Sequence, residues 1–143
     1  MSPEYPERPV PAAAGLVFRG DDILLVKRGH APNQGRWSVP GGAVEEGETV
    51  EAAVVREVLE ETSVRVRPVR VLTVADLVER DDSGRVRFHY ATVEVLCEYV
   101  EGEPMPDSDA DNARWIPMRE LHEYDVTETA LQVIRAALRE RGS

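Results

Sequence analysis

Three glutamates near the middle of the chain have the residue type and spacing best suited to chemistry. Glu57, Glu60 and Glu61 are separated by three and four residues, which places side chains on one edge of an α-helix. Like charges at this spacing repel each other, and Arg56 is the only cation near them in the sequence. A hard divalent cation such as Mg²⁺ or Mn²⁺, which prefers oxygen ligands, removes the repulsion. The sequence therefore predicts a metal site on a helix edge.

The residues before this helix fit the same kind of site. Gly41 and Gly42 form a turn, and glycine lets a backbone carbonyl approach closely where a side chain would block it. A carbonyl from this turn can therefore join the carboxylates. Metal ions held there would bridge to phosphate oxygens, polarise the phosphorus and lower the pKa of a bound water to produce the nucleophile. The pattern predicts hydrolysis of a phosphate-containing substrate.

The charge of the chain narrows the class of substrate. The formal net charge is -10 over 143 residues, and such a surface repels nucleic-acid backbones and anionic membranes. We therefore expect neither nucleic acid nor a membrane as a partner. A small anionic substrate remains compatible with this charge when metal ions lie between the two negative partners.

Composition also bounds the organisation of the chain. The single cysteine, Cys97, excludes an intrachain disulfide and a cysteine-rich metal site, and a reducing cytoplasm is the expected location. No apolar run is long enough to span a bilayer, and the first ten residues lack the apolar region of a secretory signal. We expect residues 1–10 to form a flexible N-terminal arm and residues 11–143 to form one domain.

Two segments predict helices. Residues 49–62 begin with Thr49, whose hydroxyl can cap the first turn, and their helical spacing predicts an apolar stripe of Ala52, Val55, Val58 and Leu59. Residues 127–141 form an amphipathic pattern, with the apolar positions Leu131, Ile134 and Leu138.

The remaining patterns predict strands and hairpins. Alternating or apolar runs bounded by turn residues indicate strands at residues 12–18, 23–28, 37–39, 64–78, 86–99 and 115–116. The residues 81–84 predict a turn that joins two of them as an antiparallel hairpin, and Pro40, Gly41 and Gly42 indicate a break. Strands interleaved with helices favour the α/β class, with a mixed sheet covered by helices.

The glutamate-rich helix resembles a known family signature, the Nudix box, G-x5-E-x7-R-E-U-x-E-E-x-G-U, where U is a bulky aliphatic residue. A solvated acidic helix face is the common alternative, but the order of residues favours the box. The positions in register are Gly42, Glu48, Arg56, Glu57, Val58, Glu60, Glu61 and Val64. Ser63 departs from the pattern, since the family has glycine there. A left-handed residue often follows a helix, and serine in that conformation costs about 1 kcal/mol.

The resemblance implies a fold, a metal site and a reaction. The implied fold is the Nudix α/β/α sandwich with a mixed sheet over residues 11–143. Glu57, Glu60 and Glu61 would bind Mg²⁺ or Mn²⁺ together with the carbonyl of Gly41. Arg56 would orient these carboxylates through charge-assisted hydrogen bonds, and the supporting residues would be Gly42 and Glu48.

The general base stays open at this point. Glu57 or Glu60 could serve, and so could an acid of the segment that contains Asp107, Asp109 and Asp111. The alternative interpretation of those aspartates is that they are ordinary turn formers.

Recognition of the substrate depends on residues outside the box. Lys27 and Arg28 could reach phosphate oxygens or could be a solvated strand end. Trp37 could stack on a base or could belong to the core. The segments 36–42 and 113–117 look most like small bacterial ADP-ribose pyrophosphatases, which implies a nucleoside diphosphate derivative as the substrate. ADP-ribose, another nucleotide sugar, a dinucleoside polyphosphate and an oxidised nucleoside triphosphate all fit, and many relatives form homodimers.

Two other classes of function compete with a hydrolase. A Nudix domain without turnover could act as a nucleotide sensor or an interaction module, but all four box glutamates are present here. A calcium-binding structural protein would place its acids in a short loop rather than on a helix. The sequence therefore favours a pyrophosphohydrolase.

Overall fold

A single mixed sheet forms the centre of the protein. The computed structural model describes residues 3–105 and 110–141. The seven strands are β1 (Val10–Arg19), β2 (Asp22–Arg28), β3 (Trp37–Ser38), β4 (Gly41–Ala43), β5 (Arg65–Arg80), β6 (Val86–Glu101) and β7 (Ala110–Pro117). Their main order is β3-β2-β1-β6-β5, and β4 and β7 pair with β1 and β2. β1 and β6 are parallel, whereas the other strand pairs are antiparallel. The prediction of a mixed sheet is confirmed.

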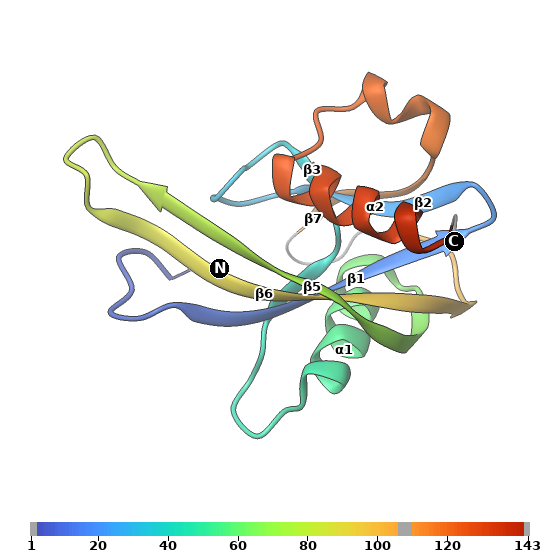
Figure 1. Ribbon diagram of the computed structural model, residues 1–143, viewed down its shortest axis with the longest axis horizontal. Coiled ribbons are helices and arrows are strands. Elements are labelled where there is room, and N and C mark those ends of the chain that lie inside the picture. Colours follow the sequence, from blue (N-terminus) through green and yellow to red (C-terminus); the bar gives the residue numbers. More distant parts are fainter. Residues whose placement is uncertain (1–2, 106–109, 142–143) are drawn as a thin grey trace.

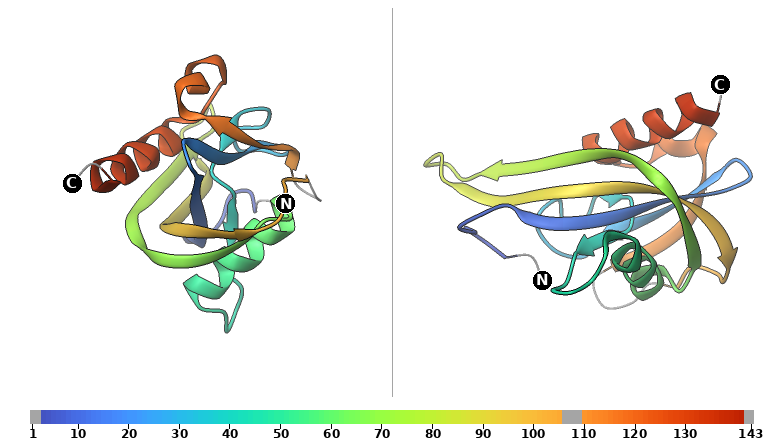
Figure 2. Two further views of the ribbon diagram at one scale, coloured as in Figure 1. Left: turned by 90° about the vertical axis from the view of Figure 1, so that its right-hand side faces the viewer. Right: turned by 60° about the horizontal axis from the view of Figure 1, so that its bottom comes forward.

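Helices cover the two faces of this sheet (Figures 1 and 2). α1 (Val50–Thr62) packs on one face and α2 (Glu128–Arg141) on the other, and a short 3₁₀ helix, η1 (Met118–Glu123), precedes α2. The arrangement is an α/β/α sandwich, as the resemblance implies. The helix ends agree with the sequence, since the Thr49 hydroxyl accepts from the Ala52 N–H at 3.1 Å.

The buried face of α1 differs from the predicted stripe. Ala53, Val54, Val58 and Thr62 are fully buried and Glu61 is largely buried, whereas Ala52 is exposed. Of the predicted stripe of Ala52, Val55, Val58 and Leu59, Val58 is buried, Val55 and Leu59 are half-buried, and the placement of Ala52 was wrong. Two polar residues share the buried face, which an apolar pattern does not reveal.

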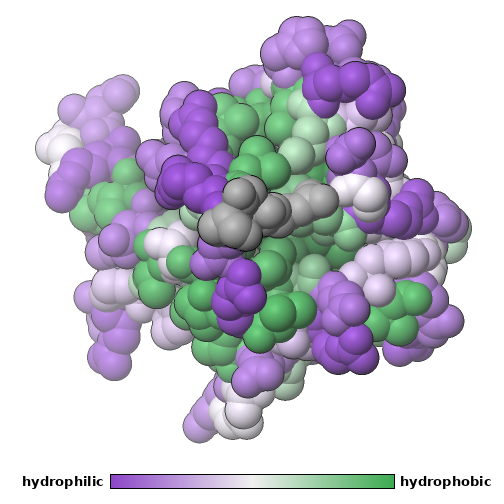
Figure 3. All heavy atoms as spheres, turned by 45° about the vertical axis from the view of Figure 1, so that its right-hand side comes forward, coloured by the Kyte–Doolittle hydropathy of each residue, from purple (hydrophilic) through white to green (hydrophobic). Residues whose placement is uncertain are grey.

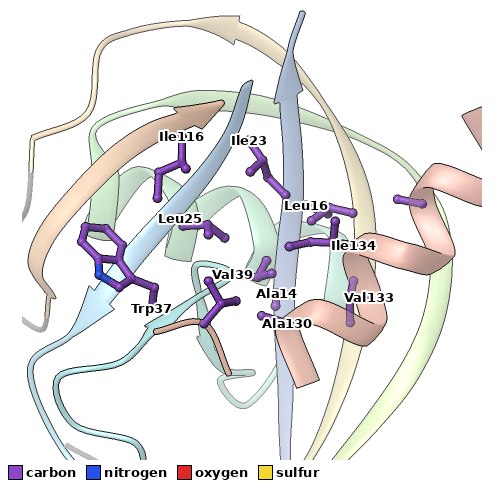
Figure 4. Packing of buried hydrophobic residues seen from close by; sticks show 12 residues of the cluster. Ala14, Leu16, Ile23, Leu25, Trp37, Val39, Ile116, Ala130, Val133 and Ile134 are labelled. Atoms are coloured by element: carbon purple, nitrogen blue, oxygen red, sulfur yellow. The ribbon is translucent and has the colours of Figure 1, made fainter. Parts of the chain in front are cut away.

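Residues of the first strands and of the last helix together form the hydrophobic core beside α2 (Figure 4). Trp37 lies at one end of this cluster, and Val133 and Ile134 of α2 lie at the other, with Leu25 and Val39 between them. Leu138 is 37% exposed, so its predicted place on the apolar side was wrong, because the buried stripe of α2 runs through Ala130, Val133, Ile134 and Ala137.

The sequence predicted a break at Pro40, Gly41 and Gly42, but part of this segment forms a short strand. Gly41 and Gly42 belong to β4, which pairs with β1 in the register Ala14 to Gly41 and Ala13 to Gly42. A Cβ on Gly41 would lie 2.5 Å from the Ala13 carbonyl oxygen. The glycine is therefore needed for the close approach of two strands.

The hairpin of β5 and β6 extends far beyond the helices (Figures 1 and 2), and its antiparallel pairing confirms the prediction. The N-terminal arm contacts its tip: the Tyr5 N–H donates to the Arg87 carbonyl at 2.7 Å, and the Tyr5 hydroxyl donates to Asp81 Oδ2 at 2.9 Å. Arg87 also pairs with Glu4 at 2.9 Å. The arm therefore lies against the hairpin from residue 4 onward.

The surface carries hydrophilic side chains around its edges, while hydrophobic ones gather near the centre of the face in Figure 3. None of the helices in the described part of the chain has the length and apolar character needed to cross a bilayer.

Candidate active site

Arg56 organises the acidic side of α1. Its guanidinium donates to both oxygens of Glu48, at 2.7 and 2.8 Å, and to Glu57 Oε1 at 2.7 Å. It also donates to Glu60 Oε2 at 3.3 Å and to the Ala43 carbonyl at 3.0 Å. A bidentate pair of this kind fixes the plane of the guanidinium. The role of Arg56 in orienting carboxylates therefore has a direct geometric basis.

The same contacts set the charge states of the pair. The hydrogen bond from Arg56, supported by the Glu45 N–H, lowers the pKa of Glu48 to about 2. The hydrogen bond to Glu48 in turn raises the pKa of Arg56 above its ordinary value. Both groups are therefore charged at neutral pH, which keeps Arg56 as a fixed positive anchor for Glu57.

Gly41 and Gly42 fit closely around two of the glutamates. The Gly41 N–H donates to Glu61 Oε2 at 2.7 Å. A Cβ on Gly42 would lie 2.6 Å from the carboxylate of Glu57. The Glu57 carboxylate therefore occupies the space that a side chain at position 42 would fill. These contacts place the carboxylates of Glu57 and Glu61 beside β4.

Both carboxylates line one open cavity of about 290 Å³. Its walls come from strands β1 to β6, from α1 and the start of α2, and from the segment after β2. Apolar residues form much of the lining, including Ala12, Ala14, Val26 and Val39. A pocket that is largely apolar, with a few polar groups at defined places, is the usual form of a small-molecule site.

Glu60 lies apart from this pair. Its side chain is 54% exposed and contacts Arg56, and it is not among the residues that line the cavity. Within residues 3–105 and 110–141, no three His, Cys, Asp or Glu side chains converge closely enough to hold a metal ion. The structure thus brings Glu57 and Glu61 to the cavity but not Glu60.

Two carboxylates at a cavity fit the needs of Mg²⁺. This ion keeps several waters and is usually bound by one or two carboxylates together with phosphates of the substrate. The pairing of β4 with β1 turns the Gly41 N–H away from β1 and toward Glu61, and in a strand the carbonyl of a residue points the same way as its N–H. Glu57, Glu61 and the Gly41 carbonyl therefore supply hard oxygen atoms of the right kind.

The three residues predicted to contact substrate separate into two groups. Arg28 lines the cavity, with its Nε donating to the Pro32 carbonyl at 2.7 Å. Lys27 is not a lining residue. Trp37 is 7% exposed, contacts Tyr124 edge to face at 5.3 Å between ring centroids, and belongs to the core. Of the two roles considered for Trp37, the structure favours the core.

The chain matches a family model along most of its length. The model, described as NUDIX domain, covers residues 8–137. The chain belongs to the NUDIX domain family, the Nudix hydrolases.

Relatives with known names support this membership. An ADP-ribose pyrophosphatase of Methanocaldococcus jannaschii is 35% identical over 113 residues, which are 79% of this chain and 64% of that protein. A putative 8-oxo-dGTP diphosphatase 2 of Mycobacterium tuberculosis is 36% identical over 78% of this chain and 76% of that protein. The chain spans less than two thirds of the archaeal relative's own length.

Solved structures agree on the fold. The crystal structure of a MutT NUDIX hydrolase from Burkholderia pseudomallei matches with a TM-score of 0.79 and 28% identity, covering 91% of this chain and 98% of that one.

Ser63, which replaces the glycine of the Nudix box, adopts the left-handed backbone conformation expected at that position. Ser63 ends α1 in the left-handed region, with φ 66°, and its N–H donates to the Leu59 carbonyl. Its hydroxyl lies 3.5 Å from the Met105 carbonyl oxygen. The turn that glycine makes in the family is therefore made here by serine.

Several polar residues that line the cavity were not predicted as site residues from the sequence, among them Glu94, Ser38 and His30. Glu94 is 4% exposed. In a strand with a period of two, Glu94 shares a face with Thr92 and Leu96, so a charged residue at an inward position was the available signal. The predicted loop acids Asp107 and Asp109 lie outside the described residues.

Proposed function

We propose that this chain is a divalent-metal-dependent pyrophosphohydrolase that acts on a nucleoside diphosphate linked to another group, with ADP-ribose as the first candidate. The proposal rests on the pair Glu57 and Glu61, which are held beside the Gly41–Gly42 backbone and line one cavity. The name of the archaeal relative supports ADP-ribose.

The proposed metal ligands are Glu57, Glu61 and the carbonyl of Gly41. Glu60 is proposed as a further ligand that turns from Arg56 when the ion binds, since over half of its side chain is exposed. A bound Mg²⁺ or Mn²⁺ would polarise the phosphoanhydride and lower the pKa of a water.

The protein's own groups then position the reactants. Arg56 holds the Glu57 carboxylate in place, and Glu48 fixes Arg56 by two hydrogen bonds. Arg28 lies on the cavity wall, where its guanidinium can bind phosphate oxygens. The proton of the attacking water goes to a carboxylate, for which Glu57, Glu60 and an acid of the segment with Asp107, Asp109 and Asp111 are the candidates.

A substrate panel tests the proposal. Purified protein with Mg²⁺ is given ADP-ribose, a second nucleotide sugar, a dinucleoside polyphosphate and 8-oxo-dGTP, and the products are identified by chromatography. For ADP-ribose the expected products are AMP and ribose 5-phosphate, formed by addition of one water. Binding without turnover of any compound, with either Mg²⁺ or Mn²⁺, would support the nucleotide sensor instead. The homodimer and the cytoplasmic location stay predictions.

A further inference from the structure

One buried carboxylate in the cavity has no role in the proposed metal site. Glu94 lies on β6, is 4% exposed and lines the same cavity as Glu57 and Glu61. Its Oε2 atom has no hydrogen-bond partner in the part of the chain that the structure describes. Burial raises the pKa of Glu94 to about 7. Buried polar atoms are normally paired, so this oxygen indicates a partner that binds in the cavity.

The strand register places Glu94 at a defined distance from the metal site. Ala14 of β1 pairs with Gly41 of β4 on one side and with Glu94 of β6 on the other. Neighbouring strands lie about 4.8 Å apart, so Glu94 is roughly 10 Å across the sheet from Gly41. Ala12 and Ala14 between them are small and also line the cavity. A nucleotide with its phosphates at Gly41 therefore has space to extend toward Glu94.

A second polar atom in this cavity lacks a partner. Ser38 of β3 lines it, and its Oγ is buried without a hydrogen bond to any described residue. A hydroxyl can donate or accept, whereas an ionised carboxylate only accepts, through two oxygens. An ionised Glu94 is therefore suited to a ligand that offers hydrogen-bond donors, and the Ser38 hydroxyl is compatible with such a ligand.

We propose that Glu94 is a specificity-determining residue that accepts hydrogen bonds from two adjacent donors of the substrate. This inference rests on the proposed function, because it takes the phosphates to lie at Glu57 and Glu61. Two groups of a nucleoside offer such a pair: the cis-diol of a ribose, and the N1–H and N2–H edge of guanine. Two donors on the ligand favour the ionised form of Glu94. Adenine offers the N6 amine beside ring nitrogens that are acceptors, so its edge would repel the second oxygen of the ionised carboxylate.

Paired substrates test this assignment. The first pair is ADP-ribose and its analogue that lacks the 2′-hydroxyl of the adenosine, and the second is a GDP-sugar and its inosine counterpart, which lacks only the N2 amine. Steady-state kinetics are measured for the wild type, for Glu94→Gln and for Glu98→Gln. Glu98 is the matched control, since it lies on the same strand but is exposed and pairs with Arg67 at 2.7 Å.

The expected result is a change in KM rather than in kcat. A site built to hydrogen-bond a donor rejects the analogue that lacks it. In the wild type, KM should therefore be at least about tenfold lower for the complete member of one pair. Glu94→Gln should abolish that ratio by raising KM for the complete substrate, with kcat within about threefold, and Glu98→Gln should keep it. The pair that responds identifies the ribose or the guanine edge as the donor.

An unchanged KM ratio in Glu94→Gln for both pairs would overturn the assignment and would mean that ordered water satisfies this carboxylate. Calorimetric binding of AMP, GMP, IMP and 2′-deoxy-AMP in EDTA separates this failure from a failure of the proposed function. If no substrate is turned over but Glu94→Gln still weakens nucleotide binding, only the hydrolase proposal fails. Ser38→Ala provides a second variant if Glu94→Gln does not fold, and unchanged binding and KM ratios in it would count against the site.

Discussion

The acidic cluster around Glu57 and Glu61 is stabilised by a few individual hydrogen bonds and ion pairs. Arg56 supplies one positive charge to Glu48 and Glu57, and the Gly41 N–H supplies a donor to Glu61. Clustered carboxylates are costly in a partly buried place unless each has a donor or a cation. The cluster therefore has separate hydrogen-bond donors for its members, and the cavity side of Glu57 and Glu61 is where a metal ion would complete the neutralisation.

Gly42→Ala is expected to reduce activity and leave the fold intact. The new Cβ would lie 2.6 Å from the Glu57 carboxylate, which is the far end of a flexible side chain and can move. Turnover should fall at least about tenfold, since misplaced catalytic groups are costly, while the melting temperature stays close to that of the wild type.

Gly41→Ala is the contrasting variant. Its Cβ would lie 2.5 Å from a backbone oxygen of Ala13, so it should lower the free energy of unfolding by about 1–3 kcal/mol. Equal effects of the two substitutions on stability and activity would contradict this account.

Glu94 makes the stability of the protein depend on pH. Burial raises its pKa from the ordinary 4.5 to about 7, so the folded state binds a proton that the unfolded state releases between these values. The free energy of unfolding therefore falls as pH rises from 4.5 to 7, and the penalty persists at higher pH. Glu94→Gln lacks this penalty and should exceed the wild type by about 1–3 kcal/mol at pH 8 but not at pH 4.

Urea unfolding in EDTA at several pH values checks this prediction. Glu98→Gln, an exposed change on the same strand, should show no comparable rise between pH 4 and pH 8. A constant difference between Glu94→Gln and the wild type over the whole range would mean that the carboxyl is not desolvated.

Helix α1 positions the acidic cluster, and both of its ends are fixed by specific backbone or side-chain interactions. Thr49 caps the first turn, and Ser63 ends the helix in a left-handed conformation that usually favours glycine. Ser63→Gly should therefore raise the free energy of unfolding by about 1 kcal/mol.

Chemical denaturation measures the effect of Ser63→Gly, and Ser63→Ala is its control. The alanine variant keeps the Cβ and loses only the hydroxyl near Met105, so it should gain nothing. Equal stabilisation by both variants would show that the hydroxyl, and not the backbone conformation, is unfavourable.

The sequence predicted α1, its caps and the hairpin of β5 and β6, because these depend on local spacing. The metal-binding chemistry stays a prediction. The sequence pattern misassigned Ala52 because Glu61 and Thr62 are buried in the helix face, and only the tertiary contacts reveal that. Ser38 and Glu94 come from β3 and β6, and no local pattern indicates that they meet in one cavity. The pairing of β4 with β1 likewise depends on a close approach between distant segments.

At the scale of the whole molecule, the fold gathers the site from across the chain. β1 carries β4 on one edge and β6 on the other, so the acidic edge of α1 and the buried Glu94 share one cavity. The net charge of -10 would disfavour an anionic substrate, and the metal ion proposed at Glu57 and Glu61 would offset that repulsion locally. Substrate binding and metal binding should therefore be strongly coupled.

Metal binding and catalysis by Glu57 and Glu61 are tested most directly by comparing turnover and Mn²⁺ binding in Glu57→Gln, Glu61→Gln and Glu51→Gln. Glu51 is the control, because it lies exposed in the first turn of α1 and does not line the active-site cavity. Glu57→Gln and Glu61→Gln should each lower kcat at least about a hundredfold and weaken Mn²⁺ binding, while both proteins remain folded. Glu51→Gln should match the wild type in kcat and in Mn²⁺ affinity. Turnover and Mn²⁺ affinity like those of the wild type in both Glu57→Gln and Glu61→Gln would contradict the proposed metal site.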